Sequence, residues 1–143
     1  MLMELGFTEA RKSFTGVIDR VQRLFPVVIQ PRKQSEEPTF LFKQAIVEQL
    51  LSEYKFNISL VDEEENHYAF WLDTLDIYGY GETKEAAFDS LVDDLLLYCQ
   101  QYTQHPERYF SAPNRKHHLP YVLKVMCCNN PEEVKRMLHQ DAS

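Results

Sequence analysis

Apolar residues recur every three or four positions over residues 10–24, which is the spacing of one face of a helix. Thr8 is a residue type that caps helices, and Glu9 after it suits the first turn. Pro26 ends the pattern, because proline disfavours helical angles in the preceding Phe25. The sequence therefore predicts one helix between Thr8 and Phe25, with an apolar face formed by Ala10, Phe14, Val17, Ile18, Val21 and Leu24.

Short apolar runs on either side of this helix are typical of strands. A second helix is predicted after them, with Ile46, Val47, Leu50 and Leu51 pointing inward. The expected elements are strands at 3–6, 26–30 and 39–42, a polar turn at 31–38, and the second helix at 43–54. This β-α-β-β-α order predicts a first domain at residues 1–55. Such a small domain cannot bury both faces of its sheet, so we expect it to form a homodimer.

The remaining residues, 56–143, predict a second α+β domain. Thr83 and Asn130 are expected to cap two helices, the second of which has Pro131 at its first position. The apolar face of the first of these helices is expected to be Ala87, Phe88, Leu91, Val92, Leu95, Cys99 and Tyr102. The other expected elements are strands at 56–60 and 67–77, a short strand at 78–83, a surface connection at 103–117, a strand at 118–126 that extends the sheet, and a helix at 129–140.

Charge is unevenly distributed between the two expected domains. Residues 8–33 hold six Lys or Arg against two acidic residues. Residues 1–55 carry eight basic and seven acidic residues (+1), whereas residues 56–143 carry seven and fifteen (−8), which together give the formal −7. An acidic surface repels phosphate, so any contact with nucleic acid is expected from the first domain.

Composition limits the cellular setting. Apolar residues make up 44% of the 143 positions, which is enough for a core, but the uninterrupted apolar runs are far shorter than a membrane span. Residues 1–20 are charged throughout and do not resemble a signal peptide. Three cysteines, two of them adjacent, are a poor disulfide framework. We expect a cytoplasmic protein with no membrane contact.

The segments F-T-E-A-R-K-S-F and F-P-V-V-I-Q-P-R-K resemble the N-terminal domain of Phd/YefM-type antitoxins. The resemblance implies that Arg11 and Arg32 contact DNA, with Lys12 and Lys33 as phosphate partners. It also implies a dimer on palindromic operator half-sites. Arg11 is expected to read bases, because the sequence places it in the first turn of the predicted helix. The hairpin departs from the family at its tip, where Pro31, extra residues and the acidic pair at 36–37 replace a tight glycine turn.

The second domain resembles the HicB-like antitoxin domain, a small degenerate ribonuclease-H-like fold. The resemblance rests on strand, acidic hairpin, strand and short strand, followed by the spacing of Gly81, Thr83, Glu85 and Ala86. The whole chain resembles Phd-like antitoxins with an appended C-terminal domain. The resemblance implies a toxin partner, commonly a basic RNA-cleaving protein, which an acidic domain would attract.

Two groups of residues raise the question of catalysis or metal binding. The carboxylates Asp73, Asp76, Glu82, Asp93 and Asp94 invite a metal-dependent nuclease, but they are expected on different faces of a strand and a helix. Cys127 and Cys128, with the histidines at 117–118, are residue types that could bind zinc. Adjacent residues of a strand point to opposite faces, and no C-x-x-C spacing is present. The sequence predicts no enzyme activity, cofactor or metal.

The leading hypothesis is an antitoxin of a type II toxin–antitoxin system that binds operator DNA as an autorepressor and neutralises a RelE-like toxin. The alternative is a module that binds a protein partner without binding DNA, which the acidic hairpin tip favours. A metal-dependent nuclease is the third hypothesis. Toxin contact could involve the helix at 43–54, the predicted edge strand near residue 120 or the final helix, and the sequence does not choose among them.

Overall fold

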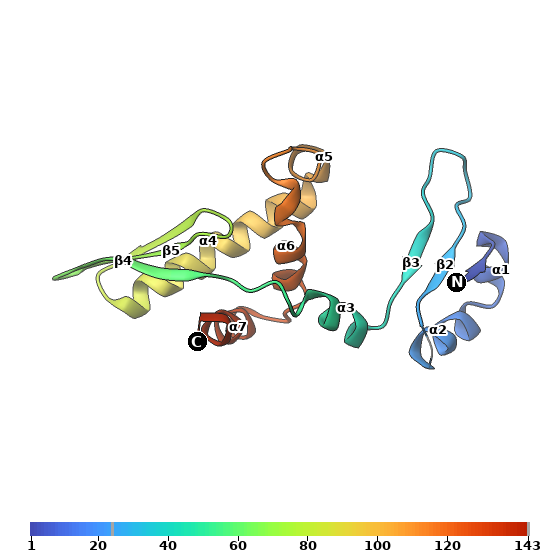
Figure 1. Ribbon diagram of the computed structural model, residues 1–143, viewed down its shortest axis with the longest axis horizontal. Coiled ribbons are helices and arrows are strands. Elements are labelled where there is room, and N and C mark those ends of the chain that lie inside the picture. Colours follow the sequence, from blue (N-terminus) through green and yellow to red (C-terminus); the bar gives the residue numbers. More distant parts are fainter. Residues whose placement is uncertain (24, 143) are drawn as a thin grey trace. The chain divides into compact units, whose positions relative to one another are not determined.

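The computed structural model describes residues 1–23 and 25–142, and the chain divides into two compact units, Met1–Leu50 and Leu51–Ser143 (Figure 1). The boundary falls within one helix, five residues before the boundary expected from the sequence. Leu24, which the sequence assigns to the apolar face of the first helix, lies outside the described residues. Among the described residues, no helix combines the length and apolarity needed to cross a membrane.

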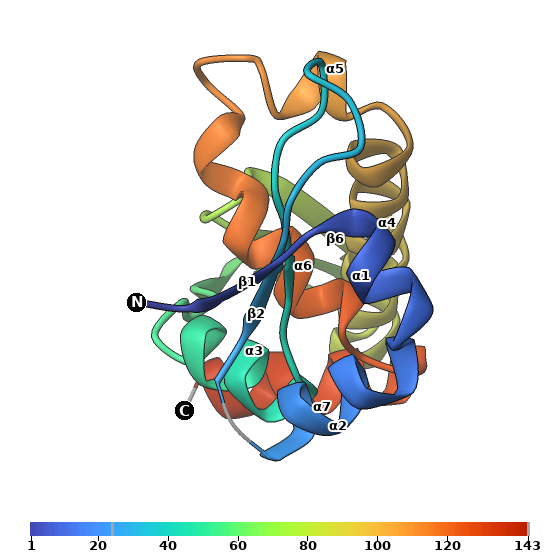
Figure 2. The same cartoon turned by 90° about the vertical axis from the view of Figure 1, so that its right-hand side faces the viewer.

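The first unit contains a three-stranded mixed sheet and short helices. β2 lies in the middle, parallel to β1 and antiparallel to β3, and Figure 2 shows β1 beside β2. The elements are β1 (Met3–Leu5), α1 (Phe7–Lys12), α2 (Phe14–Arg23), β2 (Val27–Ile29), β3 (Thr39–Leu41) and α3 (Gln44–Leu51).

The single helix predicted from Thr8 onward is wrong, because the chain leaves helical geometry at Ser13. Ser13 has φ −121° and ψ 36°, and it separates α1 from α2. The N-cap of α1 is Gly6 rather than Thr8, since the Gly6 carbonyl accepts from the Ala10 amide at 2.9 Å. The apolar periodicity did not indicate the break, because Ala10 before Ser13 and Val17 and Val21 after it are spaced as on one face of a continuous helix.

The core of the first unit is small. Ala10, Val17, Val21 and Val27 form the buried cluster, with Leu5, Ile29 and Leu41 packed against it. Phe14 and Ile18, predicted on the same apolar face, are exposed instead. The unit therefore leaves much of its apolar surface open to solvent.

The second unit is a three-stranded antiparallel sheet with helices packed against one of its faces. The strand order is β4-β5-β6, with a bulge in β4 between Leu60 and Asp62. The elements are β4 (Ile58–Glu64), β5 (His67–Leu72), β6 (Ile77–Gly81), α4 (Lys84–Gln104), α5 (Pro106–Tyr109), the 3₁₀ helix η1 (Lys116–His118), α6 (Leu119–Met126) and α7 (Pro131–Ala142).

The segment predicted as one strand over 67–77 is in fact two strands joined by a turn. β5 ends at Leu72, and Asp73 and Asp76 lie in the turn that precedes β6. The amide of Asp76 donates to the Asp73 carbonyl at 3.3 Å, and Asp76 has a positive φ of 55°, which aspartate tolerates better than most residues. The two carboxylates are therefore turn residues, not residues on opposite faces of a strand.

The strand predicted at 118–126 is also wrong, because residues 119–126 form α6. Its β-branched residues favoured a strand, but Val122 and Val125 are three positions apart and both are buried in the core. Pro120 is accommodated because it stands in the first turn of a helix, where its missing amide has no partner to lose. The sheet is therefore not extended beyond β4, β5 and β6.

The two predicted helix caps in this unit are confirmed. Thr83 Oγ1 accepts from the Ala86 amide at 3.0 Å at the start of α4, and Asn130 Oδ1 accepts from the Glu133 amide at 3.0 Å before α7. The expected connection at 103–117 is shorter, because α4 continues to Gln104 and two short helices follow.

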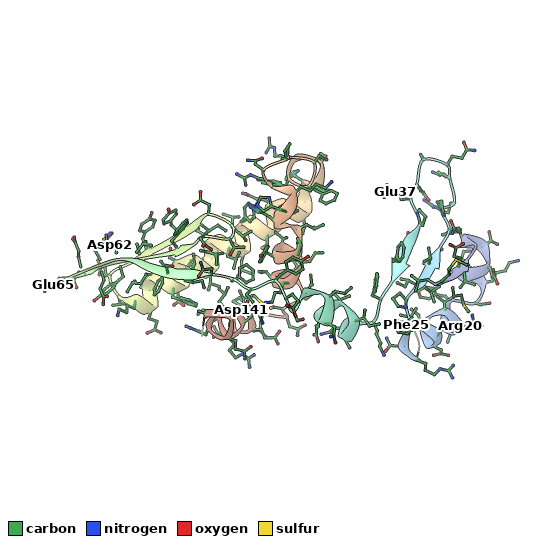
Figure 3. All side chains as sticks on the ribbon, viewed as in Figure 1. Arg20, Phe25, Glu37, Asp62, Glu65 and Asp141 are labelled. Carbon is green, nitrogen blue, oxygen red and sulfur yellow. The ribbon has the colours of Figure 1, made fainter. Side chains whose placement is uncertain are left out.

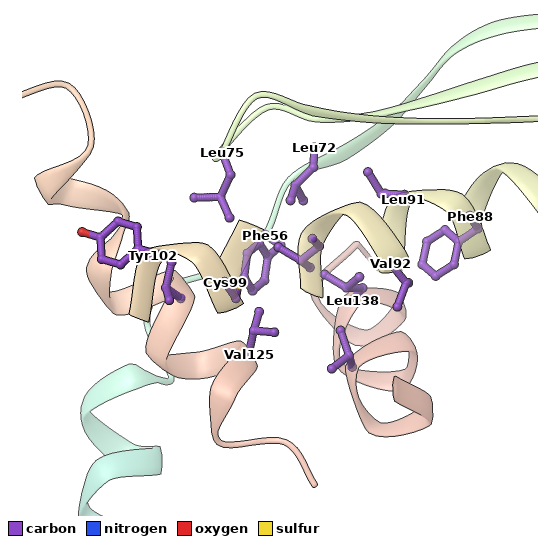
Figure 4. Close-up of a cluster of buried hydrophobic side chains, with 13 residues drawn as sticks. Phe56, Leu72, Leu75, Phe88, Leu91, Val92, Cys99, Tyr102, Val125 and Leu138 are labelled. Atoms are coloured by element: carbon purple, nitrogen blue, oxygen red, sulfur yellow. The ribbon is translucent and has the colours of Figure 1, made fainter. Parts of the chain in front are cut away.

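Helix α4 organises the core of the second unit. All seven residues predicted on its apolar face are buried, and residues of β5, α6 and α7 pack against them (Figure 4). Phe56, which precedes the sheet, is 1% exposed and joins the same core. The unit thus buries a continuous apolar interior within one chain.

Glycines allow α4 to lie directly on β6. A Cβ atom at Gly79 would be 2.5 Å from the Leu91 amide nitrogen and would also collide with the Ala87 carbonyl oxygen. One at Gly81 would be 2.7 Å from the Ala86 carbonyl carbon. Real Cβ atoms do not approach backbone so closely, so these positions require glycine for space rather than for backbone angle.

A buried carboxylate fastens the start of the second unit to its C-terminal helix (Figure 3). Asp141 of α7 accepts from the Phe56 amide at 3.1 Å and from Lys124 Nζ at 2.8 Å. Lys124 also donates to the Tyr54 carbonyl at 2.7 Å. Residues 54–56 are thereby held against α6 and α7 through charge-assisted hydrogen bonds.

Substitution of Gly79 by Ala should destabilise the second unit by about 1–3 kcal/mol, because the added methyl group collides with the backbone of α4. Fluorescence of Trp71, the one tryptophan of the sequence, follows unfolding of this unit. Gly16→Ala is the matched control, since nothing lies within 4 Å of a Cβ there, and it should leave the Trp71 transition unchanged. A Gly79→Ala transition equal to that of the wild type would contradict the packing.

Candidate nucleic-acid interface

The loop between β2 and β3 carries two of the four basic residues expected to contact DNA. Arg32 pairs with Glu36 four residues later, with Arg32 Nη2 donating to Glu36 Oε1 at 2.7 Å. The Arg32 amide also faces Glu36 Oε2, at 3.3 Å, and the Glu36 amide donates to the Lys33 carbonyl at 3.1 Å. The acidic residue thus orders the loop that presents Arg32 and Lys33.

The ion pair changes the protonation equilibria of both partners. The hydrogen bond from Arg32 lowers the pKa of Glu36, and the hydrogen bond to Glu36 raises the pKa of Arg32. Both side chains lie at the surface, where an ion pair adds little stability and can exchange partners. Arg32 is therefore charged and ordered, but it is not committed to Glu36.

Arg32 also contacts the first helix. Its guanidinium carbon lies 5.4 Å from the centroid of the Phe7 ring, within range of a cation–π interaction. Phe7 and Arg11 are four residues apart in α1 and are therefore neighbours on one face of the helix. The contact with Phe7 thus places the hairpin arginine against the helix that carries Arg11, twenty-one positions earlier in the sequence.

Arg11 and Lys12 lie in the last turn of α1, because this helix has only six residues. The expectation that Arg11 falls in a first helical turn is therefore wrong. Arg11, Lys12 and Lys33 are exposed, and among the described residues their side chains have no hydrogen bond or ion pair. The four basic residues are thus accessible, and Arg32 contacts Phe7 of the helix that carries Arg11 and Lys12.

The sequence-based expectations placed the acidic pair at 36–37 near the hairpin arginine but included neither the ion pair with Glu36 nor any role for Phe7. Arg32 and Glu36 are opposite charges four positions apart, and this spacing alone could have indicated an ion pair. The contact of Arg32 with Phe7 had no sequence signal, because it depends on where the hairpin folds back.

The residues examined for metal or enzyme chemistry do not converge. No group of three or more histidine, cysteine, aspartate or glutamate side chains with metal-binding geometry occurs in the described part of the chain. Cys127 and Cys128 follow the end of α6 rather than lying on a strand, and burial raises the pKa of Cys99 to about 12. Asp93 and Asp94 are exposed on α4.

The chain matches a family of PHD-like proteins described as "Antitoxin of toxin-antitoxin, RelE / RelB, TA system", over residues 1–140. The chain belongs to this antitoxin family. A crystal structure at 1.80 Å of the antitoxin part of a proposed toxin/antitoxin system from Syntrophomonas wolfei subsp. wolfei has 32% sequence identity and a TM-score of 0.79. The match covers 95% of this chain and 96% of that chain. No curated protein matches the sequence.

A second cluster of polar groups in the antitoxin serves its fold. Tyr98 Oη and His118 Nδ1 are 2.6 Å apart, and the guanidinium of Arg115 lies over the Tyr98 and Tyr109 rings at 5.5 and 5.4 Å. Tyr102 donates to the Arg115 carbonyl at 3.0 Å. These contacts hold the segment after α4 against that helix. Burial lowers the pKa of His118 to about 4.

Acid should weaken the second unit through His118. Its folded pKa of about 4 lies below the ordinary value of 6.5, so the unfolded chain takes up the proton first as pH falls. The contribution of neutral His118 is therefore complete above about pH 6.5 and is lost progressively down to about pH 4. His118→Gln should reduce the fall in melting temperature across this range, as followed by Trp71 fluorescence.

His117→Gln is the control for this measurement, because His117 is the exposed neighbour of His118. It should keep the wild-type pH dependence. Equal pH profiles for wild type and His118→Gln would rule out His118 as the source of acid sensitivity.

Proposed function

We propose that this antitoxin binds operator DNA as a homodimer, represses its own transcription and neutralises a RelE-like RNA-cleaving toxin. The observation that carries the DNA-binding part is the contact of Arg32 with Phe7, four residues before Arg11 on the same helix of the first unit. Arginine forks recognise phosphates and guanine edges, and here two of them come from different elements onto one side of the unit. The family description, with its RelE / RelB system, supports the toxin class.

The four basic residues have different proposed roles. Arg11 contacts a base edge, and Lys12 and Lys33 contact phosphates. Arg32 leaves Glu36 and reaches DNA, using Phe7 as a flat support for its guanidinium. Phosphate contacts give most of the affinity and the base contact gives the specificity.

A homodimer is favoured by the surface of the first unit. Among its described residues, the buried cluster consists of four, whereas large apolar side chains are open to solvent, including Phe25 at 75% and Phe14 at 54% exposure. Phe40 of the edge strand β3 and Phe42 just after it stack on each other, with centroids 6.1 Å apart, and are both exposed. A second copy would cover this surface, and a twofold axis would place two sets of arginines on palindromic half-sites.

The domain roles follow the same division. We propose that residues 1–55 are a Phd/YefM-like DNA-binding and dimerisation domain, and that residues 56–143 are a HicB-like domain that binds the toxin. The sheet followed by a long helix in the second unit is compatible with the HicB-like proposal. Its excess of acidic residues suits a basic partner.

The alternative function is a protein-binding module that does not bind DNA. One observation favours it: the carboxylate of Glu36 forms an ion pair with the guanidinium of Arg32. If the ion pair persists against DNA, the hairpin presents a neutralised tip and loses its attraction for phosphate.

Replacing Arg11 and Arg32 together by Ala should abolish binding to a labelled fragment of the antitoxin's own promoter. Arg11→Ala alone should lower the preference for this fragment by about 1–3 kcal/mol, because a base contact is lost. Lys12→Ala should instead weaken all duplexes alike and reduce the salt dependence by about one unit. Fluorescence anisotropy in a salt series measures each effect.

Arg108→Ala in the second unit is the matched control and should keep wild-type affinity. Wild-type affinity in the double variant would contradict the proposed surface. No binding by the wild type at low salt would favour the protein-binding alternative.

Glu36→Gln distinguishes the two functions directly, because it removes the carboxylate that competes with phosphate for Arg32. We expect DNA affinity to rise by about 1.5- to 5-fold, the range for an exposed ion pair. Glu37→Gln removes the neighbouring charge and should have a smaller effect. Reduced affinity of Glu36→Gln would mean that the ion pair positions Arg32 rather than competing for it.

Light scattering at micromolar concentration should give twice the 16.9 kDa chain mass, since the apolar surface of the first unit needs a partner. Replacing Phe40 and Phe42 by Ser should shift the protein toward a monomer if this surface forms the interface. Leu97→Ser, an exposed apolar position on α4, is the control and should remain dimeric. A wild-type mass of 16.9 kDa would contradict the dimer.

A further inference from the structure

The β4–β6 sheet has one face covered by α4 and one face that carries an unusual row of aromatic side chains. β6 alternates between the two faces, with Gly79 and Gly81 against α4 and Tyr78 and Tyr80 on the opposite side. Tyr80 is 56% exposed and Tyr78 39% exposed. Large aromatic residues at such exposure commonly mark contact surfaces.

The rings form a continuous row across two strands. Trp71 stacks on Tyr78 with centroids 6.0 Å apart, Tyr78 on Tyr80 at 6.2 Å, and Tyr80 on His67 at 6.4 Å. The planes of each pair are within 24° of parallel. Trp71 faces Tyr78 in the strand register, so cross-strand pairing orders the row without a ligand.

Carboxylates stand at both ends of this row. Trp71 Nε1 donates to Asp76 Oδ1 at 3.0 Å, and His67 Nε2 lies 3.1 Å from Asp62 Oδ2. The register puts Asp62 opposite Ala69 and Glu64 opposite His67, on the same face as the rings. Figure 3 labels Asp62 and Glu65 on the β4–β5 hairpin.

Positive charge is kept to the other face of the sheet. Glu63 is paired with Tyr68 in the register and therefore faces α4, where its carboxylate binds Lys84 Nζ at 2.8 Å. Among the described residues of the three strands, none is a lysine or an arginine. The aromatic face thus combines exposed rings with carboxylates, two of which have partners, His67 and Trp71, that belong to the row itself.

We propose that this aromatic–acidic face, formed by His67, Trp71, Tyr78 and Tyr80 with Asp62, Glu64 and Asp76, docks the arginine- or lysine-bearing surface of the toxin. The proposal rests on the proposed toxin-neutralising function and gives it a location. Cations bind over aromatic rings, and carboxylates at the ends of the row pair with the same side chains. The net charge of −8 over residues 56–143 steers such a partner toward this unit.

Charge distinguishes a cationic protein surface from two other possible partners of this face, single-stranded RNA and a second copy of the chain. Single-stranded RNA also stacks on aromatic rows, but such sites carry basic residues that follow the phosphates. Here the groups around the rings are carboxylates, which repel phosphate. A second copy of the same face would bring its carboxylates against the first set. A cationic protein surface is the partner that matches both features.

The test is a titration of the full-length antitoxin with a nonameric oligo-arginine peptide at low salt, followed by Trp71 fluorescence. Trp71 is a member of the row and the one tryptophan of the sequence, so the signal reports this face. We expect saturable binding. Tyr78→Ser with Tyr80→Ser should raise Kd about 5- to 30-fold, because two cation–π contacts are lost. Asp62→Asn with Glu64→Gln should raise Kd about 2- to 10-fold.

Matched controls separate this face from general acidity. Asp93→Asn with Asp94→Asn removes the same two charges from α4 and should change Kd by less than about twofold. Phe110→Ser removes an exposed ring elsewhere in the unit and should also have little effect. Circular dichroism melting should show that the Tyr78/Tyr80 variant remains folded, since both side chains point away from the core.

The proposal is overturned if the wild type does not bind the peptide, or if the Asp93/Asp94 pair matters as much as the Asp62/Glu64 pair. Saturable binding of oligo-uridine RNA to this face would overturn it in favour of a nucleic-acid site. A change in mass of the Tyr78/Tyr80 variant by light scattering would favour an interface between copies. Promoter binding, measured on the same variants, tests the proposed DNA-binding function separately. The basic residues proposed to contact DNA lie in the first unit, so these variants should keep wild-type promoter affinity.

Discussion

The close contact between α4 and β6 is the constraint on which the second unit depends. Gly79 and Gly81 leave no Cβ between strand and helix, so the backbone of α4 lies directly over the sheet. This approach brings the apolar face of α4 onto β5, and α6 and α7 pack on its other sides to close the core. Because side chains alternate along a strand, the same contact sends Tyr78 and Tyr80 to the opposite face. One packing requirement therefore determines both the buried and the exposed side of the sheet.

The two units of the antitoxin differ in how much of their apolar surface they bury within one chain. The second encloses large side chains from the sheet and several helices, and a buried carboxylate, Asp141, fastens its first residues. The first has a buried cluster of small or medium residues (Ala10, Val17, Val21 and Val27 among those described) and exposes phenylalanines that a larger domain would bury. This difference agrees with a division of labour in which the first unit completes its core by self-association while the second folds around its own interior.

The proposed functions place opposite electrostatic demands on the two units. In the first, Glu36 holds Arg32 in an ion pair that orders the loop, and Phe7 supports the guanidinium beside the helix that carries Arg11. In the second, Glu63 is paired with Lys84 on the covered face, whereas Asp62 and Glu64 remain on the open face. A lysine pairs with the carboxylate on the covered face, whereas Asp62 on the open face has the row's own His67 as its partner. The two faces of the sheet therefore differ in charge. A cationic partner and DNA would therefore meet different ends of the sequence.

Much of the local structure could be predicted from the sequence. The apolar face of α4, the caps at Thr83 and Asn130, and the short strands of the first unit all follow from periodicity and side-chain chemistry over a few residues. The same local signals failed at Ser13, where helical phase continues through a break, and at residues 119–126, where β-branched residues form a buried helix. At residues 119–126 the tertiary contacts outweighed propensity, because burial of Val122 and Val125 contributes more than the strand preference of valine.

The sequence by itself determined the composition of the candidate sites: basic residues near the N-terminus, an acidic second half, and tyrosines alternating with glycines in β6. Only the tertiary structure decided which of these residues meet. The fold of the hairpin put Arg32 on Phe7, and the register of β5 with β6 aligned Trp71 with the two tyrosines. The physical reason is that periodicity fixes the face on which a side chain lies within its own element, whereas its neighbours on other elements depend on register and chain reversal, which the packing of the whole unit selects.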